Sequence, residues 1–337
     1  MTAMTKSPGR NARGASDEVR LAAVTGAGWV VLGAAAWLYA RMKGIPEWTA
    51  LPVTAAFLIE FPFYLFPGFE ASREWLARFS KPRAAWILTA SAIAPWLVYS
   101  VATGEASATH FAVLLLIVLL VSFCYVVLPV VPLVDALFLI ALGAIYLSKS
   151  FDWIYASPIP KQALSPLGHA MLIRTGALAI LVIRGNANAE FRFLPNRSEW
   201  MTGLRYFAVA LPVAGLVYWA LGLFHLREHP LNVLQALGTF FGVLWFVALS
   251  EEFFFRGLLQ QWLEGWTRNA VAALITASVI FGSAHLGFHR IFPNWRWAIV
   301  AGILGVFLGL AWRSARSVQA SMVTHALIVT VWRVFLQ

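Results

Sequence analysis

Long runs of apolar residues dominate this chain and limit what it can fold into. Eleven such runs are separated by short polar gaps. Because about 20 apolar residues in a helix cross a bilayer, the runs predict an all-α, polytopic transmembrane helix bundle with about eleven spans. The predicted spans are 21–40, 51–69, 84–102, 110–128, 131–148, 167–183, 204–224, 232–264, 270–288, 297–312 and 318–336.

Composition supports a membrane protein. It argues against a nucleic-acid-binding protein and against a fold held by disulfides or a Cys-rich zinc site. Hydrophobic residues make up 60% of the chain, charged residues 12%, and mean hydropathy is +0.74. The net charge of +10 does not indicate a nucleic-acid partner, because Lys and Arg lie in the polar gaps, where membrane topology explains them. Cys124 is the single cysteine, so an internal disulfide and a Cys-rich zinc site are both excluded.

Three regions follow from the pattern of the runs. Residues 1–20 are polar and basic, and we expect a disordered cytoplasmic tail. Residues 21–203 carry transmembrane helices of unknown role, and residues 204–337 carry the polar groups discussed below. Lys and Arg number sixteen in one set of alternate gaps and seven in the other, which places the N-terminus inside. We expect an integral, multi-pass protein of the plasma membrane, or of the inner membrane if the source is bacterial.

A charged cluster interrupts the apolar run 232–264. Glu252 and Arg256 are four residues apart, so they are neighbours on one helix face, with the acid in the favoured N-terminal position. Glu251 points about 100° away and lacks this partner. A free carboxylate in a low-dielectric site is suited to act as a general base. Charges at this depth are costly and indicate a functional site.

Two histidines also lie within apolar runs. His285 follows the turn at 265–269 by about as many residues as Glu251 precedes it, so both lie roughly 20 Å from the turn in an antiparallel hairpin. His325 lies near the middle of the last span and can join them. By contrast, we expect His169 and Arg174 to extend toward the membrane surface from the ends of their span.

These residues resemble the motifs of the CAAX protease and bacteriocin-processing family of intramembrane glutamic endopeptidases. Glu-Glu-x-x-x-Arg begins at Glu251, Phe-x-x-x-His ends at His285, and the third motif begins at His325. The resemblance covers about Leu204 to Gln337. It implies a protease core that cleaves a membrane-associated protein or peptide, such as a prenylated, bacteriocin-like or sorted surface protein, without a cofactor.

The resemblance also implies a role for each motif residue. Glu251 would activate the attacking water, and His285 would help to hold that water. Glu252 and Arg256 would organise the site, and His325 would donate to the oxyanion of the tetrahedral intermediate. One position departs from the family pattern, which has Asn or Asp four residues after the last histidine, where this chain has Val329. Thr324, Thr330 or a backbone amide could supply the missing donor.

Other interpretations of the cluster remain open. Glu251, His285, His289 and His325 could offer three nitrogens and a carboxylate to zinc, although no His-Glu-x-x-His is present and a metal-independent glutamate mechanism is favoured. Buried charges also form ion pathways in transporters. A non-catalytic scaffold or immunity protein that holds a membrane partner protein is a further alternative.

Overall fold

The structure is a computed structural model that describes residues 8–186, 189–288 and 291–336. Its described part is helical, with one isolated bridge between Leu226 and Leu336 in place of any sheet. Within that part, nine helices are long and apolar enough to cross a membrane, and two shorter apolar helices accompany them, Pro132–Leu147 and Ala270–Ser283. Each of these eleven helices coincides with one predicted span, so the all-α, polytopic architecture is confirmed.

The chain divides into two compact units, Met1–Ala187 and Asn188–Gln337. The sequence predicted a division between residues 203 and 204 instead. The difference arises because the segment 189–196, which precedes the first helix of the second unit, bonds to helices of that unit. The segment was expected to be part of a polar gap, and a polar gap alone does not indicate which neighbour it folds against.

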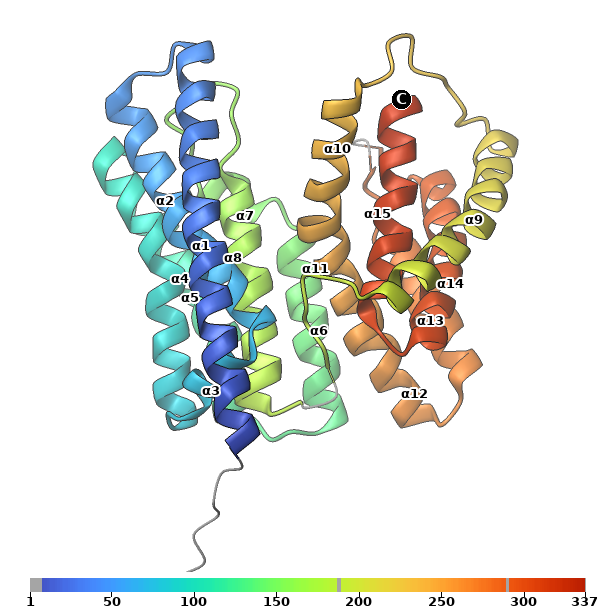
Figure 1. Cartoon of the computed structure of the whole chain (residues 1–337), viewed down its shortest axis with the longest axis horizontal. Coiled ribbons are helices and arrows are strands. Elements are labelled where there is room, and N and C mark those ends of the chain that lie inside the picture. Colours follow the sequence, from blue (N-terminus) through green and yellow to red (C-terminus); the bar gives the residue numbers. More distant parts are fainter. Residues whose placement is uncertain (1–7, 187–188, 289–290, 337) are drawn as a thin grey trace, which may run out of the picture. The chain divides into compact units, whose positions relative to one another are not determined.

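The first unit is built around one buried helix, α8, which runs Ser165–Leu178 and continues as a π-helical segment, η2, Ala179–Arg184. In the most apolar stretch of this span, 72% of the residues are buried, the highest share among the described spans. Helices α2, α4, α5 and α6 pack around it (Figure 1). The remaining elements are α1 Pro8–Lys43, α2 Glu47–Leu65, η1 Phe66–Gly68, α3 Glu70–Ala77, α4 Lys81–Thr103, α5 Ala108–Val127, α6 Pro132–Leu147 and α7 Ser150–Ile154. Helix α1 therefore begins within the stretch 1–20 that was expected to be a disordered tail.

An ion pair lies inside this bundle. Glu60 of α2 accepts two hydrogen bonds from Arg174 of α8, at 2.5 and 3.1 Å, and both side chains are at most 4% exposed. Arg174 also donates to the hydroxyl and the carbonyl oxygen of Ser91 on α4. The prediction that Arg174 extends to the membrane surface was therefore wrong, because a buried carboxylate and a carbonyl satisfy the guanidinium within the bundle.

A second ion pair binds the other end of the buried helix. Arg184, the last residue of η2, contacts Asp135 of α6 at 2.6 Å, and Tyr125 of α5 donates its hydroxyl to the same carboxylate at 2.9 Å. The two pairs join α8 and η2 to four surrounding helices. Buried charge pairs of this kind are sensitive to register, since both partners lose their hydrogen bonds when either helix slips.

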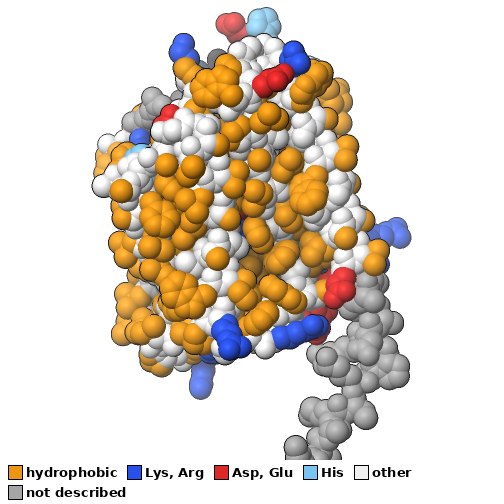
Figure 2. Space-filling model, turned by 90° about the vertical axis from the view of Figure 1, so that its left-hand side faces the viewer, with side chains coloured by type: hydrophobic (Ala, Val, Ile, Leu, Met, Phe, Trp, Pro, Cys, Tyr) orange, Lys and Arg blue, Asp and Glu red, His pale blue; other side chains and the backbone are white. Residues whose placement is uncertain are grey.

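The outer face of the first unit is apolar between two charged ends. Figure 2 shows hydrophobic side chains covering this face, with Lys, Arg, Asp and Glu gathered at its upper and lower edges. Among the exposed apolar residues are Trp86, Val101 and Leu116, each more than half exposed. Such a surface is stable against lipid rather than water. The chain is an integral, multi-pass membrane protein.

In its described residues, the second unit contains one long interrupted helix and four others (Figure 1). The long helix, called here the motif helix, runs from Val233 to Thr267. It comprises α10 Val233–Gly242, the π-helical η3 Val243–Ala248, α11 Leu249–Glu252, the π-helical η4 Phe253–Gln260 and α12 Gln261–Thr267. The others are α9 Arg197–Ala220, α13 Ala270–Ser283, α14 Trp295–Ala315 and α15 Val318–Phe335.

Local sequence explains where these helices begin. Asn196 and Asn232 each cap a helix and form a reciprocal capping box with the residue three positions later. Asn269 caps α13, and Ser317 caps α15. The predicted turn at 265–269 contains the break between α12 and α13.

Small residues let the helices of the second unit approach closely. A Cβ added at Gly282 of α13 would lie 2.5 Å from the carbonyl oxygen of Ala298 on α14, so glycine is required there. A Cβ at Gly203 of α9 would lie 2.9 Å from the carbonyl oxygen of Ala320 on α15. Close backbone approach through small residues is a common way for membrane helices to pack. Here it packs two motif-bearing helices, α13 and α15, closely against α14 and α9.

Candidate active site

The charged cluster lies where the motif helix changes its winding. Four α-helical residues, Leu249–Glu252, are flanked by π-helical turns on both sides. π-Helical turns are rare and often occur at functional sites. The predicted pair is present, since Arg256 donates to Glu252 at 3.2 Å. Glu252 is fully buried and Arg256 is 1% exposed.

Besides Glu252, the Arg256 guanidinium contacts α14 and two aromatic rings. Its second terminal nitrogen donates to the carbonyl oxygen of Gly305 at 3.1 Å. Its charge lies over the ring of Phe281 at 4.5 Å and near that of Phe255 at 5.7 Å. A cation held over an aromatic face and bonded to a carboxylate offsets part of its desolvation cost. The arginine therefore holds Glu252 in place from within the bundle.

His325 bridges the two glutamates. Its Nδ1 lies 2.7 Å from Oε1 of Glu252, and its Nε2 lies 3.9 Å from Oε2 of Glu251. A carboxylate oxygen accepts in such a contact, so Nδ1 carries the proton of this hydrogen bond. This contact sets the orientation of the ring and directs Nε2 toward Glu251. The second partner of Glu252 was not predicted, because the sequence placed Glu252 with Arg256 alone.

The two adjacent glutamates have different surroundings. The side chain of Glu252 is fully buried, whereas that of Glu251 is 20% exposed. Among the described residues, no hydrogen bond or ion pair joins Glu251 to Arg256, which agrees with the helical spacing. One carboxylate is thus held by two partners and the other remains accessible and bound only loosely. The arrangement can support a general base at Glu251.

His285 lies at the edge of this group. Helix α13 ends at Ser283, short of the predicted span 270–288, so His285 lies in the turns that follow. Its Nδ1 donates to the carbonyl oxygen of Phe281 at 2.9 Å. The Phe281 ring contacts both histidines, with centroids 4.9 Å from His285 and 6.0 Å from His325. Among the described residues, no hydrogen bond or ion pair joins His285 to Glu251.

The hydroxyls of the two threonines near Val329 are bonded to backbone oxygens. Thr324 donates to the carbonyl oxygens of Gly203 and Ala320, at 2.9 and 3.2 Å. Thr330 donates to the carbonyl oxygen of Ala326 at 2.6 Å. Each hydroxyl has one proton, and these backbone oxygens take it. His325 is therefore the side-chain donor that α15 brings to the cluster.

The four residues of the alternative zinc set do not all fall within the described part of the chain, because His289 lies outside it. In the described part, no three His, Cys, Asp or Glu side chains converge as metal ligands. The Phe281 ring contacts both His285 and His325, and His325 uses Nδ1 for Glu252.

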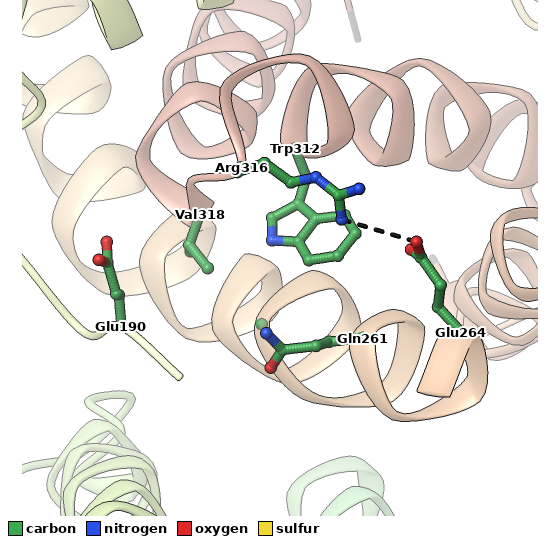
Figure 3. Close-up of a pocket in the computed structure, with 7 residues that line it drawn as sticks. Glu190, Gln261, Glu264, Trp312, Arg316 and Val318 are labelled. Atoms are coloured by element: carbon green, nitrogen blue, oxygen red, sulfur yellow. Dashed lines mark ion pairs between the residues drawn. The ribbon is translucent and has the colours of Figure 1, made fainter. Parts of the chain in front are cut away.

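A polar cavity of about 270 Å³ lies further along the motif helix, and Figure 3 shows the residues that line it. Gly257 follows Arg256 directly and forms part of the wall. Arg316 lies over the Trp312 ring at 5.7 Å and reaches Glu264 at 3.6 Å. The complete lining is Glu190, Gly257, Gln261, Glu264, Trp312, Arg316 and Val318. The sequence did not predict this cavity, which three separate segments form.

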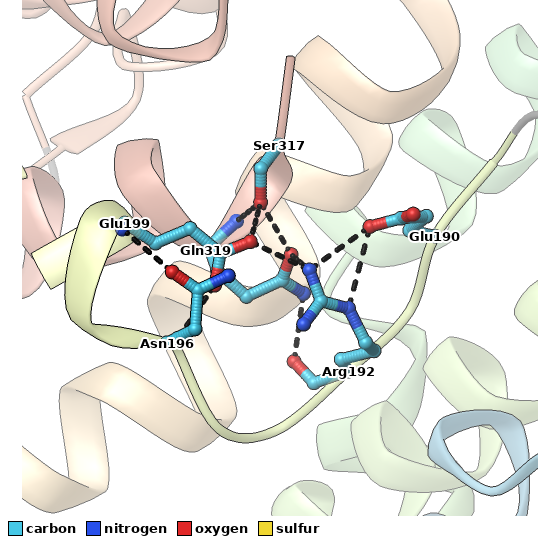
Figure 4. Close-up of polar contacts among 6 residues, drawn as sticks. All are labelled: Glu190, Arg192, Asn196, Glu199, Ser317 and Gln319. Carbon is cyan, nitrogen blue, oxygen red and sulfur yellow. Dashed lines mark hydrogen bonds and ion pairs between the residues drawn. The ribbon is translucent and has the colours of Figure 1, made fainter. Parts of the chain in front are cut away.

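The segment 189–196, which we call the strap, forms a polar network with α9 and α15 (Figure 4). Arg192 donates to Glu190, Glu199 and Gln319, at 3.1, 2.6 and 3.3 Å. Ser317 donates to Glu199 at 2.6 Å. Only the capping pattern from Asn196 to Glu199 could be recognised in the sequence. The contacts to α15 join residues more than 100 positions apart.

Comparison with known proteins agrees with the motif resemblance. No curated protein and no solved structure matches the chain. A protein-family model, Type II CAAX prenyl endopeptidase Rce1-like, matches residues 233–331. The matched stretch begins with the motif helix and includes Glu251, Glu252, Arg256, His285 and His325. Over residues 233–331, the chain is therefore similar to the Rce1-like CAAX prenyl endopeptidases.

Proposed function

We propose that this protein is an intramembrane endopeptidase of the glutamic type. The observation that carries the proposal is the position of His325 between a buried, arginine-bound Glu252 and a partly exposed Glu251. A carboxylate beside an oriented imidazole is an arrangement suited to acid–base chemistry. The family match over the same residues supports peptide-bond hydrolysis as the reaction.

In the proposed reaction, Glu251 takes one proton from a water molecule. The water oxygen bonds to the scissile carbonyl carbon, and the carbonyl oxygen becomes an oxyanion. His325, when doubly protonated, donates through Nδ1 to Glu252 and presents an N–H at Nε2 for that oxyanion. The C–N bond then breaks, and Glu251 returns the proton to the leaving amine. His285 would help to hold the water, as the resemblance implies.

The proposed substrate is a membrane-associated protein or peptide, in the plasma membrane or in a bacterial inner membrane. The family match favours a substrate of the CAAX type, with a lipid-modified cysteine near the cleaved bond. We further propose that the reaction needs no metal. The support is that Glu251 and His325 together supply a base and a hydrogen-bond donor within 3.9 Å of each other.

The proposed function can be tested with Glu251→Gln, which keeps the shape of the side chain and removes its basicity. Membranes from cells that produce the wild-type or the variant protein at equal levels would be compared by mass spectrometry of new peptide termini. We expect a defined cleavage product to disappear in the variant and its intact precursor to accumulate. Glu264→Gln, on the same helix but outside the cluster, should leave the product unchanged.

The opposite result would point to the other functions. If no terminus differs between wild type and Glu251→Gln while deletion of the whole chain has a phenotype, Glu251 is not a catalytic base. The cluster would then serve a transporter or a scaffold that holds a partner protein in the membrane.

A further inference from the structure

The strap packs against the motif helix at positions near Glu251 and Glu252. Phe191 is 1% exposed, and its ring meets that of Phe253 edge to face with centroids 5.1 Å apart. Phe253 directly follows Glu252 in the chain. Further back along the motif helix, the indole of Trp245 donates to the carbonyl oxygen of Phe193 at 3.1 Å. The strap therefore contacts this helix on both sides of the glutamate pair.

The same segment also holds the beginning of α15. The Arg192 guanidinium donates to the side-chain oxygen of Gln319, and the Gln319 amide donates back to the Arg192 carbonyl oxygen at 2.9 Å. Gln319 is fully buried. Glu199 accepts from both Arg192 and Ser317, so it ties the strap to the N-cap of α15. Loss of the Arg192 side chain would remove one donor from the Gln319 side-chain oxygen and one from the Glu199 carboxylate, whereas the bond from the Gln319 amide to the backbone would remain.

The two anchoring points lie close to the reacting groups. Gln319 precedes His325 by six residues, or about 9 Å along a helix, and Phe253 is adjacent to Glu252. The contact between His325 and Glu252 crosses from one helix to the other, so it depends on the relative register of α15 and the motif helix. A displacement of about 1 Å at such a site can reduce a rate by about 100-fold.

We propose that Arg192 is a positioning residue that keeps α15 in the register in which His325 meets Glu252. It acts through Gln319 and Glu199 and does not touch the reacting atoms. The kinetic part of this inference rests on the proposed function, whereas the geometric part does not.

The geometric part can be tested by chemical modification. The full-length protein in detergent would be treated with diethylpyrocarbonate, and the rate of His325 modification would be followed by mass spectrometry. His325 is 7% exposed, so wild-type modification should be slow. We expect the rate to rise at least threefold in Arg192→Gln and by a smaller factor in Arg192→Lys, which keeps the charge but loses the fork of donors.

Two controls separate repositioning from general unfolding. Arg197→Gln removes an exposed arginine from the first turn of α9 and should leave the His325 rate unchanged. His169, in the first unit, should react at the wild-type rate in every variant. If His325 reacts at the wild-type rate in both Arg192 variants, the inference is wrong. If His169 accelerates equally, Arg192 has a general structural role and the inference is also wrong.

The kinetic part can be tested by combining substitutions. Arg192→Gln should lower kcat at least tenfold with little change in KM, and Arg192→Lys should restore part of it. In a His325→Gln background, Arg192→Gln should cause no further loss, because its effect passes through His325. A further tenfold loss there would contradict the positioning role. If wild-type protein cleaves nothing while His325 still becomes more reactive in Arg192→Gln, the protease proposal fails and the geometric inference stands.

Discussion

At the scale of single residues, the site depends on two neighbouring glutamates with different partners. Glu252 is buried, holds Arg256 and His325, and sets the direction in which the imidazole points. Glu251 is partly exposed and lies 3.9 Å from the same imidazole. Adjacent positions on a helix are separated by about 100°, so one residue can face the interior of the bundle while the next faces the accessible side.

This division of roles predicts effects of different size on stability for two similar substitutions. Glu252→Gln removes the charge that balances buried Arg256, and loss of one partner of a buried pair costs about 3–5 kcal/mol. Glu251→Gln should change the free energy of unfolding by less than about 1 kcal/mol, because its contact is long and partly exposed. Thermal unfolding of both variants in detergent measures this difference. Equal destabilisation would show that Glu251 is also a structural residue.

A second prediction at this scale concerns metal. Because the proposed mechanism uses no zinc, a chelator such as 1,10-phenanthroline should leave the cleavage rate within about twofold of the untreated rate. His289→Ala should have an equally small effect. A rate that falls with chelator and returns with added Zn²⁺ would establish the zinc alternative built on Glu251, His285, His289 and His325.

At the scale of elements, the site is assembled by close helix packing. Glycines at the contacts of α13 with α14 and of α9 with α15 leave no room for a side chain. Gly282 belongs to the same motif as His285, so this motif specifies a packing contact as well as a histidine. Interruptions of the motif helix by π-turns add to this local geometry, since they alter the angles at which successive side chains project.

Two glycine substitutions test the importance of packing. Gly282→Ala should destabilise the protein by about 1–3 kcal/mol, because its Cβ would meet the backbone of α14 and the helices would have to separate. Gly238→Ala, in α10, meets nothing within 4 Å and should be neutral or stabilising by up to about 1 kcal/mol. Thermal unfolding of the two variants provides the measurement. Similar behaviour of the two would contradict the packing argument.

At the scale of the whole molecule, each unit has its own buried charges. In the second unit they form the candidate site, whereas in the first unit the ion pairs of Glu60 with Arg174 and of Asp135 with Arg184 bind helices together. The charged side chains of both pairs bond to each other and to neighbouring helices, which favours a structural role for these pairs. The family match lies within the second unit, so the first unit contributes a separate helical bundle to the same chain.

The structural role of the first unit's ion pair can be tested by a double substitution. Glu60→Gln or Arg174→Met alone should cost about 3–5 kcal/mol, because each leaves an uncompensated buried charge. The double variant should be more stable than either single variant, since it removes both charges. Thermal unfolding and size-exclusion profiles would report this. Additive losses would show that the two side chains do not depend on each other.

The sequence by itself determined the features that depend on neighbouring residues. Hydropathy over about 20 residues predicted all eleven apolar helices. Each membrane-spanning helix must be apolar and must satisfy its own backbone hydrogen bonds, so the signal lies within one segment. The pair of Glu252 with Arg256 was predictable because it is also local: residues four apart in a helix lie on one face. The motif spacing also identified His325 as a member of the cluster.

Only the tertiary structure decided which distant groups meet. His325 contacts Glu252, which lies 73 positions away in the sequence, and Arg174 bonds to Glu60, which lies 114 positions away. The boundary at Ala187 and the bonds from the strap to α15 were likewise not predictable. Each of these contacts depends on the rotation and register of packed helices. Those are set by side-chain volumes and glycine contacts summed over the whole bundle, and no local stretch of sequence contains that information.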